Sequence, residues 1–248
     1  MDLGELSSIG GFFALRRRGD ETSGAPSPGT VTSDGPGAPL AGLYAGDDRP
    51  LTLRVDAVEG RLGAPERRIA VSIAHLGLAA RLWSIALGSA ALFGELPALD
   101  AEQLYWAPDR STPDDLWLRT PNPSDGLQTL PGTAAQIHAT VQAAHLVPLA
   151  EAFRRDTSVS RGLLWGNAGS ALAGAGRQLD AWARREGRGE VAERAAALVR
   201  ELLRDPELAG TVREPGLRRA TCCLYYRVPG GGLCGDCVFD HPPARVVR

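Results

Sequence analysis

The C-terminal half of the chain carries hydrophobic residues at helical spacing. From Thr133 to Arg204, apolar positions recur three or four residues apart, which is typical of helices that pack one face against a core. The hydroxyls of Thr133 and Ser160 can cap the first two of these helices, and Pro148 is expected to kink the first or restart it. The pattern predicts a third helix over Glu190–Arg204.

The second of these helices, from Ser160 to Arg185, is rich in glycine. Each glycine lowers helix propensity by about 1 kcal/mol relative to alanine, so a repeated use of glycine needs a reason. The pattern predicts close packing of this helix against another element or a ligand. The glycines are Gly162, Gly166, Gly169, Gly174 and Gly176.

The most apolar stretch of the sequence is Ile69–Phe93. Its uninterrupted apolar part follows Arg81 and is only about a dozen residues long, whereas a helix needs about 20 to span a bilayer. We therefore expect one buried core helix or two, with His75 as a core histidine whose ring nitrogens are hydrogen-bonded.

Alternating and aromatic-rich patterns predict strands before this helical half. Leu51, Leu53 and Val55 alternate with polar residues, so the region 40–59 is interpreted as containing a half-buried strand. Residues 103–106 and 115–119 are rich in aromatic side chains and are separated by residues typical of turns. These two stretches predict a pair of strands.

The N-terminal region combines a helical pattern with a polar segment. Residues 1–18 predict a short amphipathic helix ending in three arginines, and residues 19–39 are dense in Gly, Pro, Ser and Thr, as in a flexible linker. The expected fold class is α+β, with a mostly helical body, a small antiparallel sheet and a C-terminal cysteine hairpin. The expected domains are the helix and linker over 1–39, the body over 40–210 and the C-terminal segment over 211–248.

Composition narrows the function classes. Of the 248 residues, 44% are hydrophobic, which is enough for a core. The formal net charge is -2 and the sequence has no long basic run, which argues against general nucleic-acid binding. The first residues are acidic, with no basic region ahead of an apolar run, so no secretory signal is predicted and a cytoplasmic location is expected.

All the cysteines of the chain lie in one short stretch near its end. The spacing is Cys222-Cys223, ten residues, Cys234, two residues, Cys237. Thiolates bind both zinc and iron-sulfur clusters. Adjacent cysteines do not easily grip one tetrahedral ion, which favours a cluster; structural zinc, a redox dithiol and unligated thiols remain alternatives.

A second polar group falls on one face of the first C-terminal helix. His138, Gln142 and His145 stand at helical spacing. Because no acidic residue occupies a matching position, the two histidines are interpreted as polar surface side chains and not as part of a metal site.

The cysteine pattern, with Tyr225, Tyr226 and Arg227 soon after the first pair, resembles the ferric-siderophore reductases of the FhuF-like family. The segment Leu164–Asn167 also resembles a Leu-Trp-Gly-Asn segment of that family and of the related siderophore synthetases. Residues 1–65 add nothing to the resemblance. The insertion at 19–39 departs from the family pattern and leaves the N-terminal topology open.

The resemblance implies a 2Fe-2S cluster bound by Cys222, Cys223, Cys234 and Cys237, with 40–210 as a siderophore-reductase-like body and 211–248 as the iron-sulfur-binding segment. It implies transfer of one electron to Fe(III) in a hydroxamate siderophore and release of Fe(II). The sequence has no recognisable dinucleotide or flavin motif, so a separate electron donor, a ferredoxin or a reductase-like protein, is expected. A peripheral contact with the inner face of the cytoplasmic membrane or with a siderophore importer is a further expectation.

Candidate substrate residues are Trp165, Asn167 and Arg227. Arginines outnumber acidic residues in the C-terminal segment and could form a basic rim that suits an acidic electron donor. The rim would consist of Arg218, Arg219, Arg227, Arg245 and Arg248, and ordinary solvated surface arginines are the alternative interpretation. Two rival functions are a zinc-stapled interaction protein and a siderophore-binding protein without redox activity.

Overall fold

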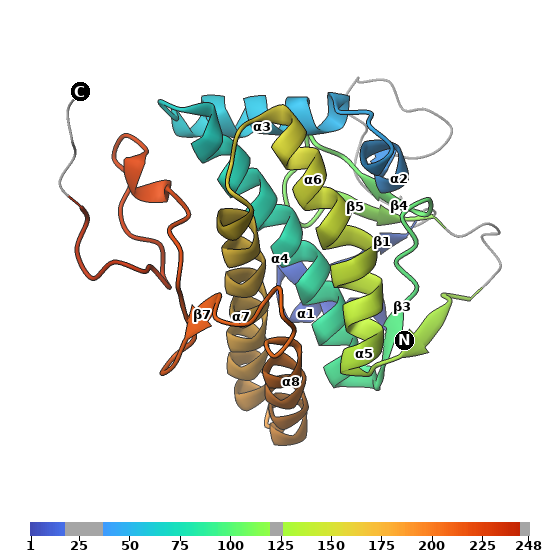
Figure 1. The fold of residues 1–248 in the computed structure, drawn as a ribbon. Helices are drawn as coiled ribbons and strands as arrows, with labels where there is room; N and C mark the ends of the chain where they lie inside the picture. The colour runs from blue at the N-terminus through green and yellow to red at the C-terminus, as the bar shows by residue number, and fades with distance from the viewer. Residues whose placement is uncertain (18–36, 120–125, 244–248) are drawn as a thin grey trace.

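A computed structural model describes residues 1–17, 37–119 and 126–243 of the chain. Its centre is the long helix α4 (Arg67–Phe93), which packs against α7 (Arg161–Arg185), α3 (Arg49–Leu62) and α8 (Gly189–Leu202). Figure 1 shows α7 and α8 side by side next to α4. The fold is α+β, as predicted.

Shorter elements surround this helical centre. The remaining helices of the described ranges are α1 (Leu3–Ser8), α2 (Leu40–Tyr44), α5 (Ala134–Ile137), the π-helical stretch η2 (His138–Leu146), α6 (Val147–Asp156), and the 3₁₀ turns η1 (Gly11–Phe13) and η3 (Tyr225–Arg227). The strands are β1 (Arg16–Arg17), β2 (Ala38–Pro39), β3 (Glu95–Pro97), β4 (Leu104–Trp106), β5 (Leu116–Leu118), β6 (Thr129–Pro131), β7 (Val212–Arg213) and β8 (Arg218–Arg219).

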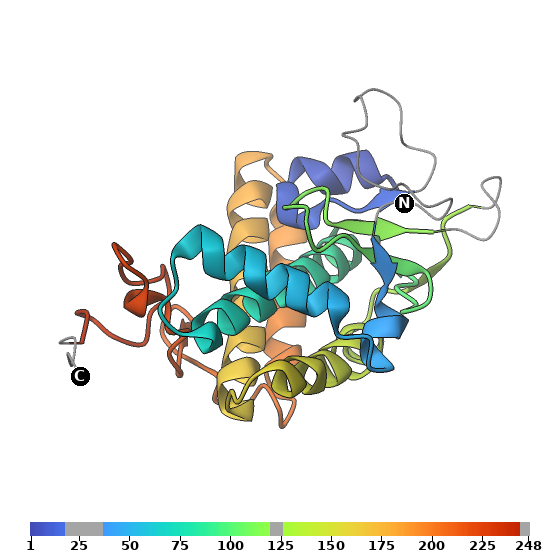
Figure 2. The ribbon, with the colours of Figure 1, turned by 90° about the horizontal axis from the view of Figure 1, so that it is seen from above.

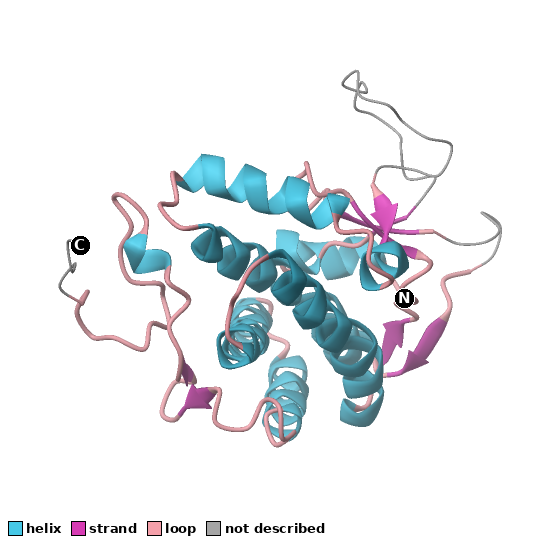
Figure 3. Cartoon of the chain, turned by 45° about the horizontal axis from the view of Figure 1, so that its top comes forward, coloured by secondary structure: helices cyan, strands magenta, loops and turns pink. Residues whose placement is uncertain are grey.

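The strands form small sheets at the edges of the helical body (Figure 3). The largest has the order β1-β5-β4-β2, in which β1 and β5 run parallel and the other neighbours antiparallel. The predicted pair of strands is confirmed, since Tyr105 of β4 pairs with Trp117 of β5. The antiparallel pairs β3-β6 and β7-β8 complete the sheets of the described residues.

The prediction of a core helix over the most apolar stretch is confirmed, and the helix is continuous. In the described residues, α4 is the one helix long and apolar enough to cross a membrane, and 78% of its most apolar window is buried inside the fold. Burial of that kind marks α4 as the core helix of a folded domain.

The strand predicted within 40–59 is wrong, because α2 and α3 occupy this region. Leu51, Val55 and Val58 are buried at the spacing of one helix face, while Leu53 is 60% exposed. Leu51 and Val55 belong to both an alternating and a helical pattern, and Val58 is the residue that decides between them. Pro50 fits the first turn of α3, where its missing N–H is not needed.

The single helix predicted over 1–18 is also wrong. The helix α1 ends at Ser8, and the chain then turns through Gly10, whose φ of 151° favours glycine, before it reaches β1. The larger apolar residues buried in this region are Leu6, Ile9, Phe13 and Leu15, whereas Phe12 is exposed. Most of the predicted linker lies outside the described residues, and its last two residues form β2.

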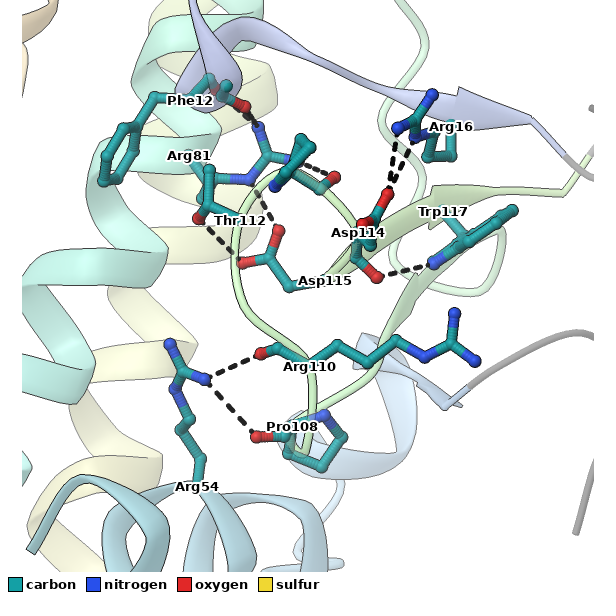
Figure 4. Close-up of polar contacts among 12 residues, drawn as sticks. Phe12, Arg16, Arg54, Arg81, Pro108, Arg110, Thr112, Asp114, Asp115 and Trp117 are labelled. Atoms are coloured by element: carbon teal, nitrogen blue, oxygen red, sulfur yellow. Dashed lines mark hydrogen bonds and ion pairs between the residues drawn. The ribbon is translucent and has the colours of Figure 1, made fainter. Parts of the chain in front are cut away.

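A buried ion pair fixes the N-terminal segment and the turn before β5 on α4 (Figure 4). Arg81 Nε donates to Asp115 Oδ1 at 2.8 Å, and both side chains are almost fully buried. Arg81 Nη1 also donates to the carbonyl oxygens of Gly11 and Phe12, at 2.8 and 2.6 Å. One arginine thus joins three segments that are distant in sequence.

His75 on α4 is buried, as predicted, but its hydrogen bonding differs from the expectation. Its ring stands edge-on to Phe153, and within the described residues Nδ1 has no hydrogen-bond partner. Burial lowers the pKa of His75 from 6.5 to about 3.

The low pKa of His75 predicts acid sensitivity. Between pH 6.5 and 3, His75 binds a proton in the unfolded chain but stays neutral in the folded chain. The free energy of unfolding therefore decreases as the pH falls through this range, by up to about 1.4 kcal/mol per pH unit. His75→Leu is expected to flatten the loss of unfolding free energy between pH 6 and 4, measured by urea denaturation. Parallel pH curves for the two proteins would contradict this.

The three predicted C-terminal helical segments are confirmed, the first two with their predicted caps. The side chain of Thr133 accepts a hydrogen bond from the backbone of Gln136, and that of Ser160 from Leu163. Pro148 lies in the first turn of α6, where the α-helix restarts after the π-helical stretch.

The π-helical stretch overturns the surface interpretation of His145, which is buried, and Gln142 is buried as well. His145 Nε2 lies 2.6 Å from the Leu99 carbonyl oxygen, and its Nδ1 lies 2.8 Å from the Tyr44 hydroxyl. His138 stays at the surface and pairs with Asp205, at 3.1 Å. His138 Nε2 and Gln142 Nε2 both contact Asp205, whereas the wider winding of the π-helix places His145 against Tyr44.

Candidate metal centre

The cysteine segment, residues 218–239, lies on the opposite side of the helical body from the four-stranded sheet (Figures 1 and 2). It follows β7 and begins at β8, whose backbone pairs with β7. The segment contacts the body chiefly through α7, with η3 also touching α4. The cysteines are therefore held beside the helices and outside the main core.

Gly166 and Gly169 of α7 leave the space in which this segment packs against the helix. A Cβ atom at position 166 would overlap Thr221 Oγ1 and lie 3.1 Å from Thr221 Cβ. A Cβ atom at position 169 would overlap Thr211 in the same way, at 2.8 Å from its Cβ. The predicted close packing of the glycine-rich helix is thus found, and its partner is the chain that leads into the cysteines.

A buried chain of hydrogen bonds connects the helices to the first cysteine pair. Ser72 on α4 donates through Oγ to the Cys223 carbonyl oxygen at 2.9 Å. Asn167 on α7 donates through Nδ2 to Ser72, at 2.9 Å to the carbonyl oxygen and 3.1 Å to Oγ. Asn167 Oδ1 in turn accepts from Arg219 Nη2. Backbone at Cys223 is thereby fixed by side chains from both central helices.

The second cysteine pair is fixed by a tight turn. The Cys237 N–H donates to the Cys234 carbonyl at 3.1 Å, and the Arg219 N–H donates to the Asp236 carbonyl at 3.1 Å. Ser170 on α7 donates to the Asp236 carboxylate at 2.5 Å. Both pairs are therefore anchored to the same helix.

The loop between the pairs depends on its glycines. Gly230 has a φ of 70°, in the left-handed region that favours glycine. A Cβ atom at Gly231 would lie 2.7 Å from the Tyr225 carbonyl oxygen. These two positions let the chain reverse direction and bring Cys234 back to Cys223.

All four thiols are free of disulfides, and the reversal brings two of them into contact. The sulfurs of Cys223 and Cys234 lie 3.7 Å apart, and the Leu224 N–H donates to Cys222 Sγ at 3.3 Å. Cys223 and Cys237 are buried, whereas Cys222 and Cys234 are half-exposed. Among the described residues, no three His, Cys, Asp or Glu side chains are placed as the ligands of a single metal ion.

Hydrogen bonding and burial separate the acidities of the thiols. The hydrogen bond with Cys234 lowers the pKa of Cys223 to about 7 and raises the pKa of Cys234. Burial raises the pKa of Cys222. One thiol of the group therefore ionises readily at neutral pH, the form in which cysteine binds metals.

Residues 219–239 match the model of the FhuF 2Fe-2S C-terminal domain. The cysteine segment is similar to an FhuF-type 2Fe-2S domain. The match includes all four cysteines, and a 2Fe-2S cluster is the cofactor of this domain. No curated protein matches the chain.

The residues of the FhuF-type domain fit such a cluster. Four free thiols lie on one short segment, two of them in contact, and a backbone N–H already donates to sulfur at Cys222. All-cysteine ligation and hydrogen bonds to sulfur are the usual features of protein-bound 2Fe-2S groups. The assignment of all four cysteines as ligands stays a prediction.

The three candidate substrate residues do not lie together in the described structure. Trp165 is buried in the core and Asn167 is enclosed by Ser72 and Arg219. Arg227 Nη1 pairs with Glu66 at 2.9 Å, and the guanidinium lies over the Tyr226 ring. Their role in substrate binding stays a prediction.

The predicted basic rim loses one member, because Arg219 is buried. Arg218 pairs with Asp240 at 2.7 Å, and Arg245 and Arg248 lie outside the described residues. Arg219 was expected at the surface, and Ser72 was not predicted as part of the site. A serine in an apolar helix gives no signal of its partner, whereas the position of Arg219 just before the metal-binding motif could have indicated a role at the site.

Proposed function

We propose that this protein is a ferric-siderophore reductase, in which Cys222, Cys223, Cys234 and Cys237 bind the 2Fe-2S cluster. The observation that carries the proposal is the FhuF-type 2Fe-2S domain, presented on a segment beside the helical body. The proposed substrate is Fe(III) held by a hydroxamate siderophore, and the product is Fe(II).

The chemistry of iron explains why one electron suffices for release. Fe(III) is a hard cation that charged oxygen chelators hold tightly, whereas Fe(II) binds the same ligands far more weakly. A bound 2Fe-2S cluster supplies one-electron chemistry. Each Fe(III) takes up one electron, and a separate donor protein of the ferredoxin or reductase type supplies one electron for each Fe(II) formed.

The cysteine segment would serve this function by holding the cluster where a ferric siderophore can approach it from solvent. Cys222 and Cys234 are half-exposed, so the side of the site that they form is open to a docking chelate. Arg227 and Tyr226 lie nearby in sequence and form a cation-π pair, with the guanidinium 5.7 Å from the ring centroid. We propose that ferric siderophores dock at this side, in the cytoplasm.

The test uses full-length protein loaded with a 2Fe-2S cluster under anaerobic conditions. With dithionite as the reductant and a ferrous chelator as the trap, the wild type is expected to release Fe(II) from ferrioxamine or ferrichrome at least tenfold faster than Cys234→Ser/Cys237→Ser. Because the exchange of sulfur for oxygen is small, circular dichroism should show that the variant keeps its helices.

Two outcomes would contradict the proposal. Stoichiometric zinc with no iron in the purified protein, together with failure of cluster reconstitution, would favour a zinc-stapled interaction protein. Siderophore binding that survives the double cysteine substitution, with no Fe(II) formed by the loaded wild type, would favour a binding protein without redox activity.

A further inference from the structure

Arg219 is a buried cation next to the cysteines. It stands three residues before Cys222 and is 1% exposed. Burial of an arginine costs several kcal/mol unless an opposite charge or a full set of hydrogen-bond acceptors compensates it. The groups around Arg219 therefore show how far its charge is compensated.

The guanidinium is held in place by neutral acceptors. Nε donates to the Thr221 carbonyl oxygen at 2.7 Å, and Nη2 donates to Asn167 Oδ1. Asn167 is itself fixed by two hydrogen bonds to Ser72. The position of the charge is thus set by both central helices.

The compensation of this charge is incomplete. In the described parts of the chain, Arg219 forms no ion pair with a carboxylate, and its Nη1 atom is buried without a hydrogen-bond partner. A buried donor without an acceptor in a folded protein needs an explanation, and a redox role, an ion or a bound water molecule is the usual one.

The charge is held beside both cysteine pairs. Arg219 Nε donates to the carbonyl oxygen of Thr221, the residue before Cys222, at 2.7 Å. The backbone N–H of Arg219 donates to the carbonyl oxygen of Asp236, the residue before Cys237, at 3.1 Å. The guanidinium therefore stands next to the backbone that carries the cysteines of the cluster site.

We propose that Arg219 is a positioning residue that compensates the negative charge of the 2Fe-2S cluster and raises its reduction potential. A cluster with four thiolate ligands is an anion, and reduction adds one further negative charge. A fixed cation in a poorly solvated position stabilises the reduced form more than the oxidised form. The proposal rests on the cluster ligation given under the proposed function.

A merely structural role for Arg219 predicts different results. If Arg219 only links Thr221 and Asn167 through hydrogen bonds, its substitution would affect folding and cluster retention. It would not change the reduction potential of clusters that remain bound. Arg219→Gln removes the charge, whereas Arg219→Lys keeps it and loses the guanidinium fork. Arg213→Gln removes the same charge from an exposed position on β7 and serves as the matched control.

The experiment is an anaerobic redox titration of the loaded full-length proteins, followed by the electron paramagnetic resonance signal of the reduced cluster. Arg219→Gln is expected to disfavour reduction at least tenfold, which is 59 mV for a one-electron couple. Arg219→Lys should restore most of this difference, and Arg213→Gln should leave the equilibrium within twofold of the wild type. A loaded Arg219→Gln with the wild-type potential overturns the proposal.

A second variant keeps the test decisive if Arg219→Gln loses its cluster. Asn167→Asp sets a carboxylate against the same guanidinium, which cancels the charge with Arg219 in place, so the potential is again expected to fall. An unchanged potential, or loss of the cluster from Arg219→Gln and Asn167→Asp while both remain folded, assigns Arg219 to assembly and overturns the proposal. A wild type that binds no cluster contradicts the proposed function itself.

Discussion

Asp115→Asn is expected to lower the free energy of unfolding by about 3–5 kcal/mol. The substitution keeps the shape of the side chain but leaves Arg81 as a buried charge without a counterion. Burial already acts against the charged form, because it lowers the pKa of Arg81. Urea denaturation with a shared m-value would measure the difference.

The neighbouring residue provides a matched control for this pair. Asp114 pairs with Arg16 at 2.9 Å, but these side chains are 50% and 43% exposed (Figure 4). Asp114→Asn removes the same charge from a solvated pair and should change the unfolding free energy by no more than about 1 kcal/mol. Equal effects of the two substitutions would contradict a core role for Arg81.

Gly166→Ala is expected to displace the cysteine segment and to reduce the iron bound per protein after reconstitution by at least half. The added methyl group overlaps Thr221 Oγ1, which must rotate away, and Thr221 Cβ, 3.1 Å from the new atom, must then give by a few tenths of an ångström. The backbone from Thr221 to Cys223 is therefore expected to shift away from α7. Iron content and visible absorption of the reconstituted protein measure the effect.

Gly162→Ala is the control for the glycine substitution. It lies on the same helix, and a Cβ atom there meets nothing within 4 Å. The substitution should leave the iron content unchanged and stabilise the helix by up to about 1 kcal/mol. Wild-type iron content in Gly166→Ala would show that the segment does not depend on this contact.

The helical half of the fold was predictable because local signals agree there. Thr133 and Ser160 stand directly before apolar positions at helical spacing, and the glycines of α7 indicated close packing. Around Leu51 and Val55, two periodicities share the same residues, so a short window favoured the wrong one. The π-helical stretch changes the period itself, which a 3.6-residue pattern does not represent.

At the candidate site, too, some features were predictable from the sequence and others were not. Cysteine spacing favoured a cluster over structural zinc, a redox dithiol or unligated thiols, and the family resemblance implied that all four cysteines bind it. The network of Ser72, Asn167 and Arg219 joins three segments that are far apart in sequence. Single-sequence patterns do not report contacts of this kind, and the burial of Arg219 became visible only in three dimensions.

The most direct test of the reductase function is a single anaerobic turnover. Protein with a fully reduced cluster is mixed with ferrioxamine and a ferrous chelator, without further reductant. Reoxidation of the cluster with one Fe(II) trapped for each electron lost is the predicted result. A cluster that stays reduced, with Fe(II) no higher than for Cys234→Ser/Cys237→Ser, would contradict the proposed function.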